Sequence, residues 1–142
     1  ARHPDHLRTS LVESRLAQVP EDVCKEADAL LCHLDNLVAE VKAAVGIHER
    51  RDTLATARAE SVPDELLAAA EVQLERLKEL HAAVSMGNLE TLRLALKVAE
   101  VSGVKPEELK DARQTHSDWC AAFRECESAS ASQEAERLRR GL

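Results

Sequence analysis

Val19-Pro20-Glu21-Asp22-Val23 recurs along the chain as Val62-Pro63-Asp64-Glu65-Leu66 and as Pro106-Glu107-Glu108-Leu109. The three prolines lie 43 residues apart, and each stretch has the features of a helix start. Proline is tolerated in the first turn because its missing N–H would find no partner within the helix there. The acidic pair that follows lies at the positive end of the helix dipole. The recurrence predicts about three repeated units, each opened by a proline-led helix.

The apolar positions behind these starts keep the same register in the first two copies. Ala27, Leu31, Leu34, Leu37, Ala39 and Val41 match Ala70, Leu74, Leu77, Leu80, Ala82 and Val84. In the third copy, Cys120 and Phe123 take the core positions that Leu34 and Leu37 hold in the first. Repeats of this length indicate stacked supersecondary units, because no unit can bury its apolar face alone.

Each unit is expected to consist of a long helix followed by a shorter one. The predicted pairs are about 21–45 with 48–60, about 64–86 with 89–102, and about 107–127 with a charged helix at 133–139 behind a Ser/Ala stretch at 128–132. Gly46, Gly87 and Gly103 are placed to end helices in the left-handed conformation. The helix at 89–102 is apolar nearly all round, which predicts a central position in the core.

Composition agrees with closely packed helices, because Trp119 and Phe123 are the only aromatic residues and sheets favour aromatic side chains. In length and helix pairing, residues 10–140 resemble the αα-hairpin repeats of the HEAT and armadillo class. The sequence thus predicts one all-α domain, 1–142, of about three two-helix repeats, stacked as a short solenoid or as a compact antiparallel helical bundle. Its predicted parts are an orphan helix at about 10–19 and units at 20–62, 63–105 and 106–142.

The charge of the chain argues against nucleic acid as a partner. The formal net charge is −7, whereas a protein that neutralises phosphates needs a basic face.

The longest apolar runs fall far short of the roughly 20 residues that span a bilayer, so no transmembrane segment is expected. The chain begins at Ala1 without a methionine, which is compatible with removal of a targeting segment. An organelle would then be the expected compartment, and otherwise the cytoplasm.

No catalytic residue is expected. The four glycines form neither a GxGxxG turn nor a phosphate-binding loop. His116-Ser117-Asp118 brings together the residue types of a catalytic triad. Successive helical side chains point about 100° apart, however, and cannot relay a proton among themselves.

Three residues are candidates for binding a metal or a cofactor. His116 and Cys120 are spaced i, i+4 on one helix face, which is a workable pair of metal ligands. The favoured alternative is a core thiol beside a partly buried histidine. His81 stands where the first copy has Val38 and is a candidate cofactor contact, with a half-buried histidine as the favoured alternative. His3 and His6 lie in a start that is expected to fray, and they carry no functional prediction.

The cysteines are expected to be free thiols buried in the core. Neither Cys24 with Cys32 nor Cys120 with Cys126 can bridge within one helix, because their Cα atoms would lie roughly 9–12 Å apart. A disulfide would have to join the first long helix to the last.

Two groups of basic residues can dock an acidic partner or a membrane surface, although solvated faces are favoured. They are the arginines at 50, 51 and 58 and those at 137, 139 and 140.

These observations predict a non-enzymatic protein–protein interaction or scaffold module, because stacked repeats build extended surfaces that bind other proteins. The expected partners are other protein subunits of a larger assembly, for example an organellar complex of photosynthesis or respiration, with peripheral association to a membrane complex as one form of it. No cofactor is expected. The alternative function is a helical cofactor- or metal-binding protein that uses histidine and cysteine. Exposed apolar area is expected at the ends of the array or along one long helix.

Overall fold

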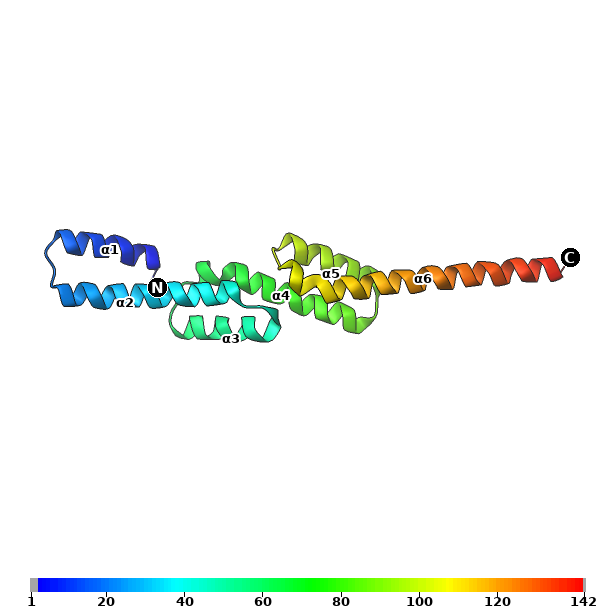
Figure 1. Ribbon diagram of the computed structural model, residues 1–142, viewed down its shortest axis with the longest axis horizontal. Helices are drawn as coiled ribbons and strands as arrows, with labels where there is room; N and C mark the ends of the chain where they lie inside the picture. Colours follow the sequence, from blue (N-terminus) through cyan, green and yellow to red (C-terminus); the bar gives the residue numbers. More distant parts are fainter. Residues whose placement is uncertain (1–2, 142) are drawn as a thin grey trace. The chain divides into compact units, whose positions relative to one another are not determined.

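The computed structural model describes residues 3–141, and over that range it contains helices and turns but no strand. Short and long helices alternate along the chain (Figure 1): α1 Pro4–Leu16, α2 Glu21–Ala43, α3 Gly46–Ala59, α4 Asp64–Met86, α5 Leu89–Val101 and α6 Pro106–Arg140. The predicted all-α fold is confirmed.

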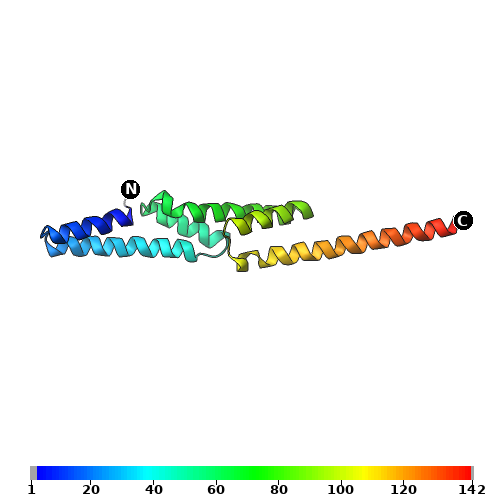
Figure 2. The same ribbon diagram turned by 90° about the horizontal axis from the view of Figure 1, so that it is seen from above.

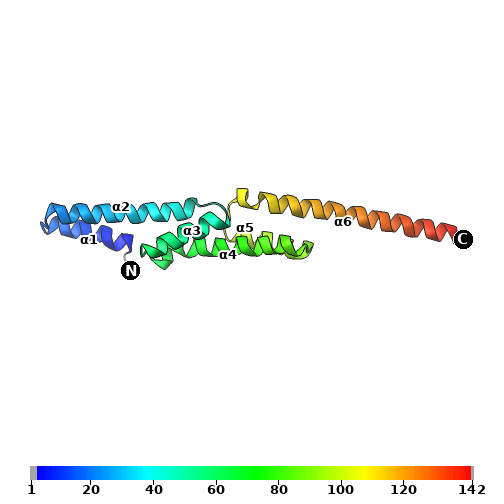
Figure 3. The ribbon, with the colours of Figure 1, turned by 90° about the horizontal axis from the view of Figure 1, so that it is seen from below.

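The chain divides into two units, residues 1–77 and 78–142. In the first unit, α1 lies along the first half of α2, and α3 packs against α2 as well (Figures 1 and 3). One buried cluster joins three helices of this unit and consists of Leu34, Leu37 and Val41 from α2, Leu54 and Ala57 from α3, Val62, and Leu67, Ala70 and Leu74 from α4. The buried apolar residues of the second unit are Leu80, Ala83, Leu92, Leu96, Ala99, Val104, Leu109 and Ala112.

Each short helix passes into the following long helix through the same turn. The N–H groups of Val19, Val62 and Val104 donate to the carbonyls of Ser14, Ala57 and Ala99 at 3.1, 3.0 and 3.2 Å. The residue before each valine has a positive φ, namely 58° at Gln18, 61° at Ser61 and 77° at Gly103. This is the Schellman arrangement, in which a left-handed residue ends the helix and the next apolar residue turns back to pack on it.

An ion pair across each hairpin recurs as well. Arg15 contacts Asp28 at 2.5 Å, Arg58 contacts Glu71, and Arg113 contacts Glu100 at 2.7 Å. The two partners are 13 residues apart in every case. In the third hairpin the charges are exchanged, because the acid lies on the short helix. The chain therefore contains three short–long hairpins that share this turn and an ion pair between their helices: α1–α2, α3–α4 and α5–α6.

The third hairpin is displaced by one residue from the 43-residue interval. The turns and ion pairs recur after 43 and then 42 residues, because Lys105 stands between Val104 and Pro106. The buried Leu109 and Ala112 are thus the counterparts of Leu67 and Ala70. The register predicted for the third copy is wrong by one residue, because Trp119 rather than Cys120 takes the position of Leu77 after a 42-residue interval. Cys120 is half-buried, and Phe123 is 58% exposed.

Two further element predictions are corrected. α6 is one continuous helix (Figure 2), and the Ser/Ala stretch at 128–132 lies inside it rather than ending it at Glu127. Serine and alanine both fit a helix interior, and no glycine or proline interrupts the stretch. α5 is not a central helix, because Leu94, Val98 and Val101 are 51%, 42% and 83% exposed.

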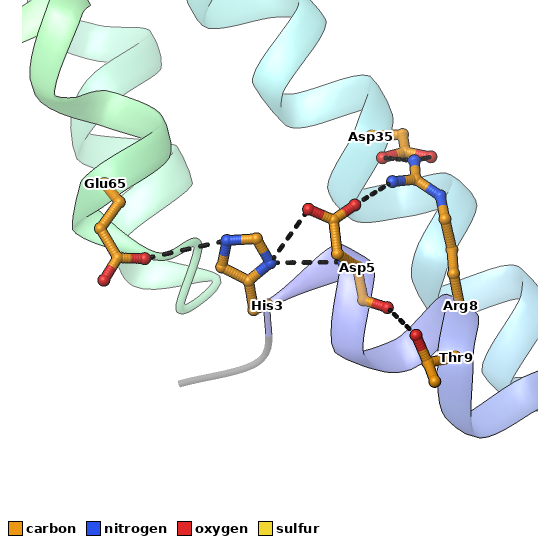
Figure 4. A network of polar contacts seen from close by, with 6 residues as sticks. All are labelled: His3, Asp5, Arg8, Thr9, Asp35 and Glu65. Atoms are coloured by element: carbon orange, nitrogen blue, oxygen red, sulfur yellow. Dashed lines mark hydrogen bonds and ion pairs between the residues drawn. The ribbon is translucent and has the colours of Figure 1, made fainter.

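The first helix begins earlier than expected, at Pro4 instead of about residue 10, and it ends at Leu16. His3 caps it, since its Nδ1 accepts the N–H of Asp5 at 3.3 Å. Its ring nitrogens also lie 3.6 Å from Asp5 Oδ2 and 3.8 Å from Glu65 Oε2 (Figure 4). Arg8 donates to both carboxylate oxygens of Asp35 at 2.9 and 2.8 Å, and these bonds raise the pKa of its guanidinium. The start of the described chain therefore makes polar contacts with both α2 and α4.

We expect the exchanged ion pair of α5–α6 to tolerate a second exchange. Glu100→Arg alone, or Arg113→Glu alone, places like charges face to face and should lower the free energy of unfolding by about 1 kcal/mol, because half-exposed pairs contribute about 0.2–1 kcal/mol. The double variant should recover most of this loss, since its pair has the order seen in Arg15–Asp28. A double-mutant cycle by urea unfolding measures the coupling, and strictly additive losses would contradict the prediction.

Candidate interaction surfaces

The candidate metal ligands His116 and Cys120 lie together on α6. The Cys120 Sγ is 3.9 Å from Nδ1 and 3.8 Å from Nε2 of His116, and both side chains are half-buried. Within residues 3–141, no group of three or more histidine, cysteine, aspartate or glutamate side chains is arranged to hold a metal ion. Near this pair, the hydrogen bonds from Arg93 lower the pKa of the Glu90 carboxyl, and His116 contributes in the same direction.

The candidate cofactor contact His81 is exposed on α4 rather than half-buried as expected. Its carbonyl accepts a hydrogen bond from the Ser85 hydroxyl at 3.1 Å. A core position is excluded for this side chain, because the buried face of the helix here is formed by Leu80 and Ala83. The spacing of His81 from Val38 could not reveal this difference in burial.

All four cysteines are free thiols, as predicted, but their burial differs from the prediction. Cys24 is buried and Cys120 is half-buried, whereas Cys32 and Cys126 are exposed. Cys24 takes the position of Leu67 in the first hairpin, which explains its burial. Cys126 lies on the part of α6 that is exposed on every side, so its neighbours in sequence do not bury it.

The arginines of the basic cluster at 50–58 do not lie together on one solvated face. Arg50 has no exposed surface, and its Nη1 donates to Gln73 Oε1 at 2.6 Å. Arg58 is paired with Glu71, and Arg51 is exposed and lies 3.5 Å from Asp52. The terminal arginines at 137, 139 and 140 are exposed, and they belong to α6 instead of a separate short helix.

The second half of α6 is exposed on all sides. We call residues Ala121–Arg140 the α6 extension; every one of them is exposed, and the segment remains helical throughout. It is about 30 Å long at 1.5 Å per residue. Phe123 and Leu138 are its large apolar side chains, 58% and 64% exposed. Within its own unit, over residues 78–141, no side chain covers the extension.

A shallow pocket lies between α1 and α2 in the first unit. We call it the α1–α2 groove; its volume is about 70 Å³, and it is lined by Leu7, Ser10, Leu11, Ser14, Val23, Cys24 and Ala27. Five of these side chains are apolar or a thiol. Val23 is 54% exposed at its edge. A pocket of this size and lining suits an inserted apolar side chain rather than a polar substrate.

The third apolar surface is the outer face of α5. Leu94, Val98 and Val101 follow one another at i, i+4 and i+7, which places them on one stripe. Exposed apolar area was predicted at the ends of the array or along one long helix. That prediction is incomplete, because this stripe lies on a short helix. Amphipathic spacing of this kind is how a helix presents anchors to a partner helix or groove.

No helix among residues 3–141 has both the length and the apolar character that crossing a membrane requires. No protein-family model, curated protein or solved structure matches this chain. The candidate function therefore rests on the three surfaces above.

Proposed function

We propose that this protein is a non-enzymatic helical interaction module that binds other protein subunits. The single observation that carries the proposal is the α6 extension, which is helical from Ala121 to Arg140 while every residue is exposed. A helix gains most of its stability in a protein by packing an amphipathic face, and an unpacked helix of this length is marginal in water. A partner that covers the extension supplies that packing.

The extension offers a face that a partner can cover. The buried face of α6 begins with Leu109 and Ala112 and continues through the half-buried Trp119. One turn further on, Phe123 continues this face but is 58% exposed. Covering a phenylalanine contributes about 1.5–3 kcal/mol, and buried aromatic side chains are frequent anchors of protein interfaces. The exposed α5 stripe supports the same function.

Amide hydrogen exchange on the full chain tests the proposal. In the dilute free protein, the amides of Ala121–Arg140 should exchange with little protection, while those near Leu109 should be protected. Adding native extract to the immobilised protein should retain a protein that protects the extension. Phe123→Asp should abolish this retention, and Val72→Asp should not, because Val72 is an exposed residue of α4.

Two results would contradict the proposal. The first is strong protection of the extension in the dilute free protein, which would show that it needs no partner. The second is equal retention by Phe123→Asp and the unmodified chain, which would show that the extension is not the binding surface.

A further inference from the structure

The first unit contains an internal example of how the second half of a long helix is covered. In the first unit, Leu34, Leu37 and Val41 in the second half of α2 form one buried cluster with the α3–α4 hairpin. They are 0%, 6% and 1% exposed. The hairpin contributes Leu54, Ala57, Leu67 and Ala70 to the same cluster.

The repeat gives both sides of this contact a second, uncovered copy. The recurring turns and ion pairs relate α2 to α6 by 85 residues, since Asp28 and Arg113 hold equivalent positions. The counterparts of Leu34, Leu37, Val38 and Val41 in α6 are therefore Trp119, Ala122, Phe123 and Cys126. These four side chains have kept an apolar or thiol character, yet Trp119 is half-buried and the other three are exposed.

The α1–α2 groove is the counterpart of the surface on the α3–α4 hairpin. With the 43-residue offset, Leu11, Ser14, Cys24 and Ala27 correspond to Leu54, Ala57, Leu67 and Ala70. Ser14 and Ala27 are half-buried, whereas Ala57 and Ala70 are 0% and 6% exposed. Val23 is 54% exposed, whereas its counterpart Leu66 packs against the cluster. Leu11 and Cys24 are 6% and 7% exposed, nearly as buried as Leu54 and Leu67 at 3% and 0%. The groove thus has the apolar lining of the covered site, but it is left open at Val23, Ser14 and Ala27.

We propose that the α6 extension of one copy docks in the α1–α2 groove of a second copy, in the way that the second half of α2 covers the α3–α4 hairpin. This inference rests on the proposed function and names the partner as a second copy of this chain. Phe123 takes the place of Val38, and Val23 takes the place of Leu66. Because the two surfaces differ, the contact is heterologous, and each added copy offers a new groove and a new extension. The expected assembly is an open, head-to-tail chain.

The test measures the mass of the reduced full chain by light scattering and sedimentation over a range of concentrations. The unmodified protein should pass from 15.6 kDa at high dilution to a dimer and larger species as the concentration rises. Val23→Asp and Phe123→Asp should each weaken association at least about tenfold, since each buries a charge in place of an apolar contact. Leu138→Asp is the matched control and should associate normally, because α2 ends before the position equivalent to Leu138.

Mixing the two variants distinguishes a head-to-tail contact from a symmetric one. Phe123→Asp retains an intact groove, and Val23→Asp retains an intact extension. An equimolar mixture should therefore form a dimer of twice 15.6 kDa and stop there, because the one remaining interface cannot propagate. Both variants change exposed side chains, and Asp at position 23 lies in the first turn of α2, where an acid is favourable. Circular dichroism verifies that each variant folds.

The outcomes separate this inference from the proposed function. If the mass stays at 15.6 kDa at protein concentrations up to about 1 mM, any contact between copies has a Kd above that concentration, and the inference is overturned. A dimer that neither grows nor reforms on mixing would overturn the head-to-tail arrangement. If the chain is monomeric but Phe123→Asp still abolishes retention of another protein, the proposed function stands and the second copy is excluded as the occupant.

Discussion

Replacing Leu34 with alanine is expected to lower the free energy of unfolding by about 3–5 kcal/mol. Leu34 has no exposed surface and belongs to the cluster in which α2, α3 and α4 meet. Its removal loses the transfer free energy of the side chain and leaves a cavity that three helices can close only in part. Domains of this size have about 5–15 kcal/mol of stability in total, so the loss is a large fraction.

Urea unfolding followed by circular dichroism measures this effect at equilibrium. Val72→Ala is the matched control, because Val72 is a branched apolar residue of α4 that is 46% exposed. Its loss should cost less than about 1 kcal/mol, since surface substitutions seldom cost more. A loss below about 1 kcal/mol for Leu34→Ala would show that the cluster is loosely packed and would contradict the structure.

The long helices of the first two copies could be predicted closely from the sequence. The second was predicted at about 64–86 and is Asp64–Met86, and the first was predicted at about 21–45 and is Glu21–Ala43. The starts of both helices depend on local features, namely a proline and an acidic pair, which act within one or two turns. Gly46, which was predicted to end the first long helix, is instead the first residue of α3, and α2 already ends at Ala43. A glycine ends the second long helix as predicted. The positive φ of 68° at Gly87 confirms the predicted end of α4.

Burial could be predicted less well, because it depends on neighbours that lie far away in sequence. The apolar surface of α5 exceeds what its neighbours cover, so Val101 stays 83% exposed although its sequence resembles that of a central helix. The register of the third copy was also predicted wrongly. Matching Pro106 with Pro63 ignored the extra residue Lys105, and a shift of one residue turns a helix by about 100°. Leu109 is therefore buried at the position of Leu67 rather than of Leu66. Phe123 is exposed for another reason, because every residue of the α6 extension is exposed.

One signal in the sequence would have improved the register predicted for the third copy. Opposite charges 13 residues apart recur at Arg15–Asp28, Arg58–Glu71 and Glu100–Arg113. Their intervals give the offsets of 43 and 42 directly, and the exchange of acid and base in the third pair argues for contact. The same offsets identify the α6 extension and the α1–α2 groove as counterparts of surfaces that are covered elsewhere in the chain.

The second large effect is expected at Arg50, which the sequence placed in a surface cluster. Its side chain has no exposed surface, and Nη1 donates to Gln73 Oε1 at 2.6 Å between α3 and α4. Arg50→Ala removes a buried donor and opens a cavity the size of a long side chain. We expect a loss of about 2–4 kcal/mol, because a buried acceptor that loses its donor costs about 1–3 kcal/mol and the cavity adds to this.

Two further variants separate the contribution of charge from that of packing. Arg50→Met keeps most of the volume and should recover part of the loss, because an apolar replacement avoids the cost of burying a charge. Arg51→Ala changes the exposed neighbour and should alter the free energy of unfolding by less than about 0.5 kcal/mol. If Arg51→Ala lowered the free energy of unfolding as much as Arg50→Ala, the assignment of Arg50 as the arginine that stabilises the contact between α3 and α4 would be wrong. If Arg50→Met were as unstable as Arg50→Ala, the hydrogen bonds of the guanidinium rather than its volume would account for the effect.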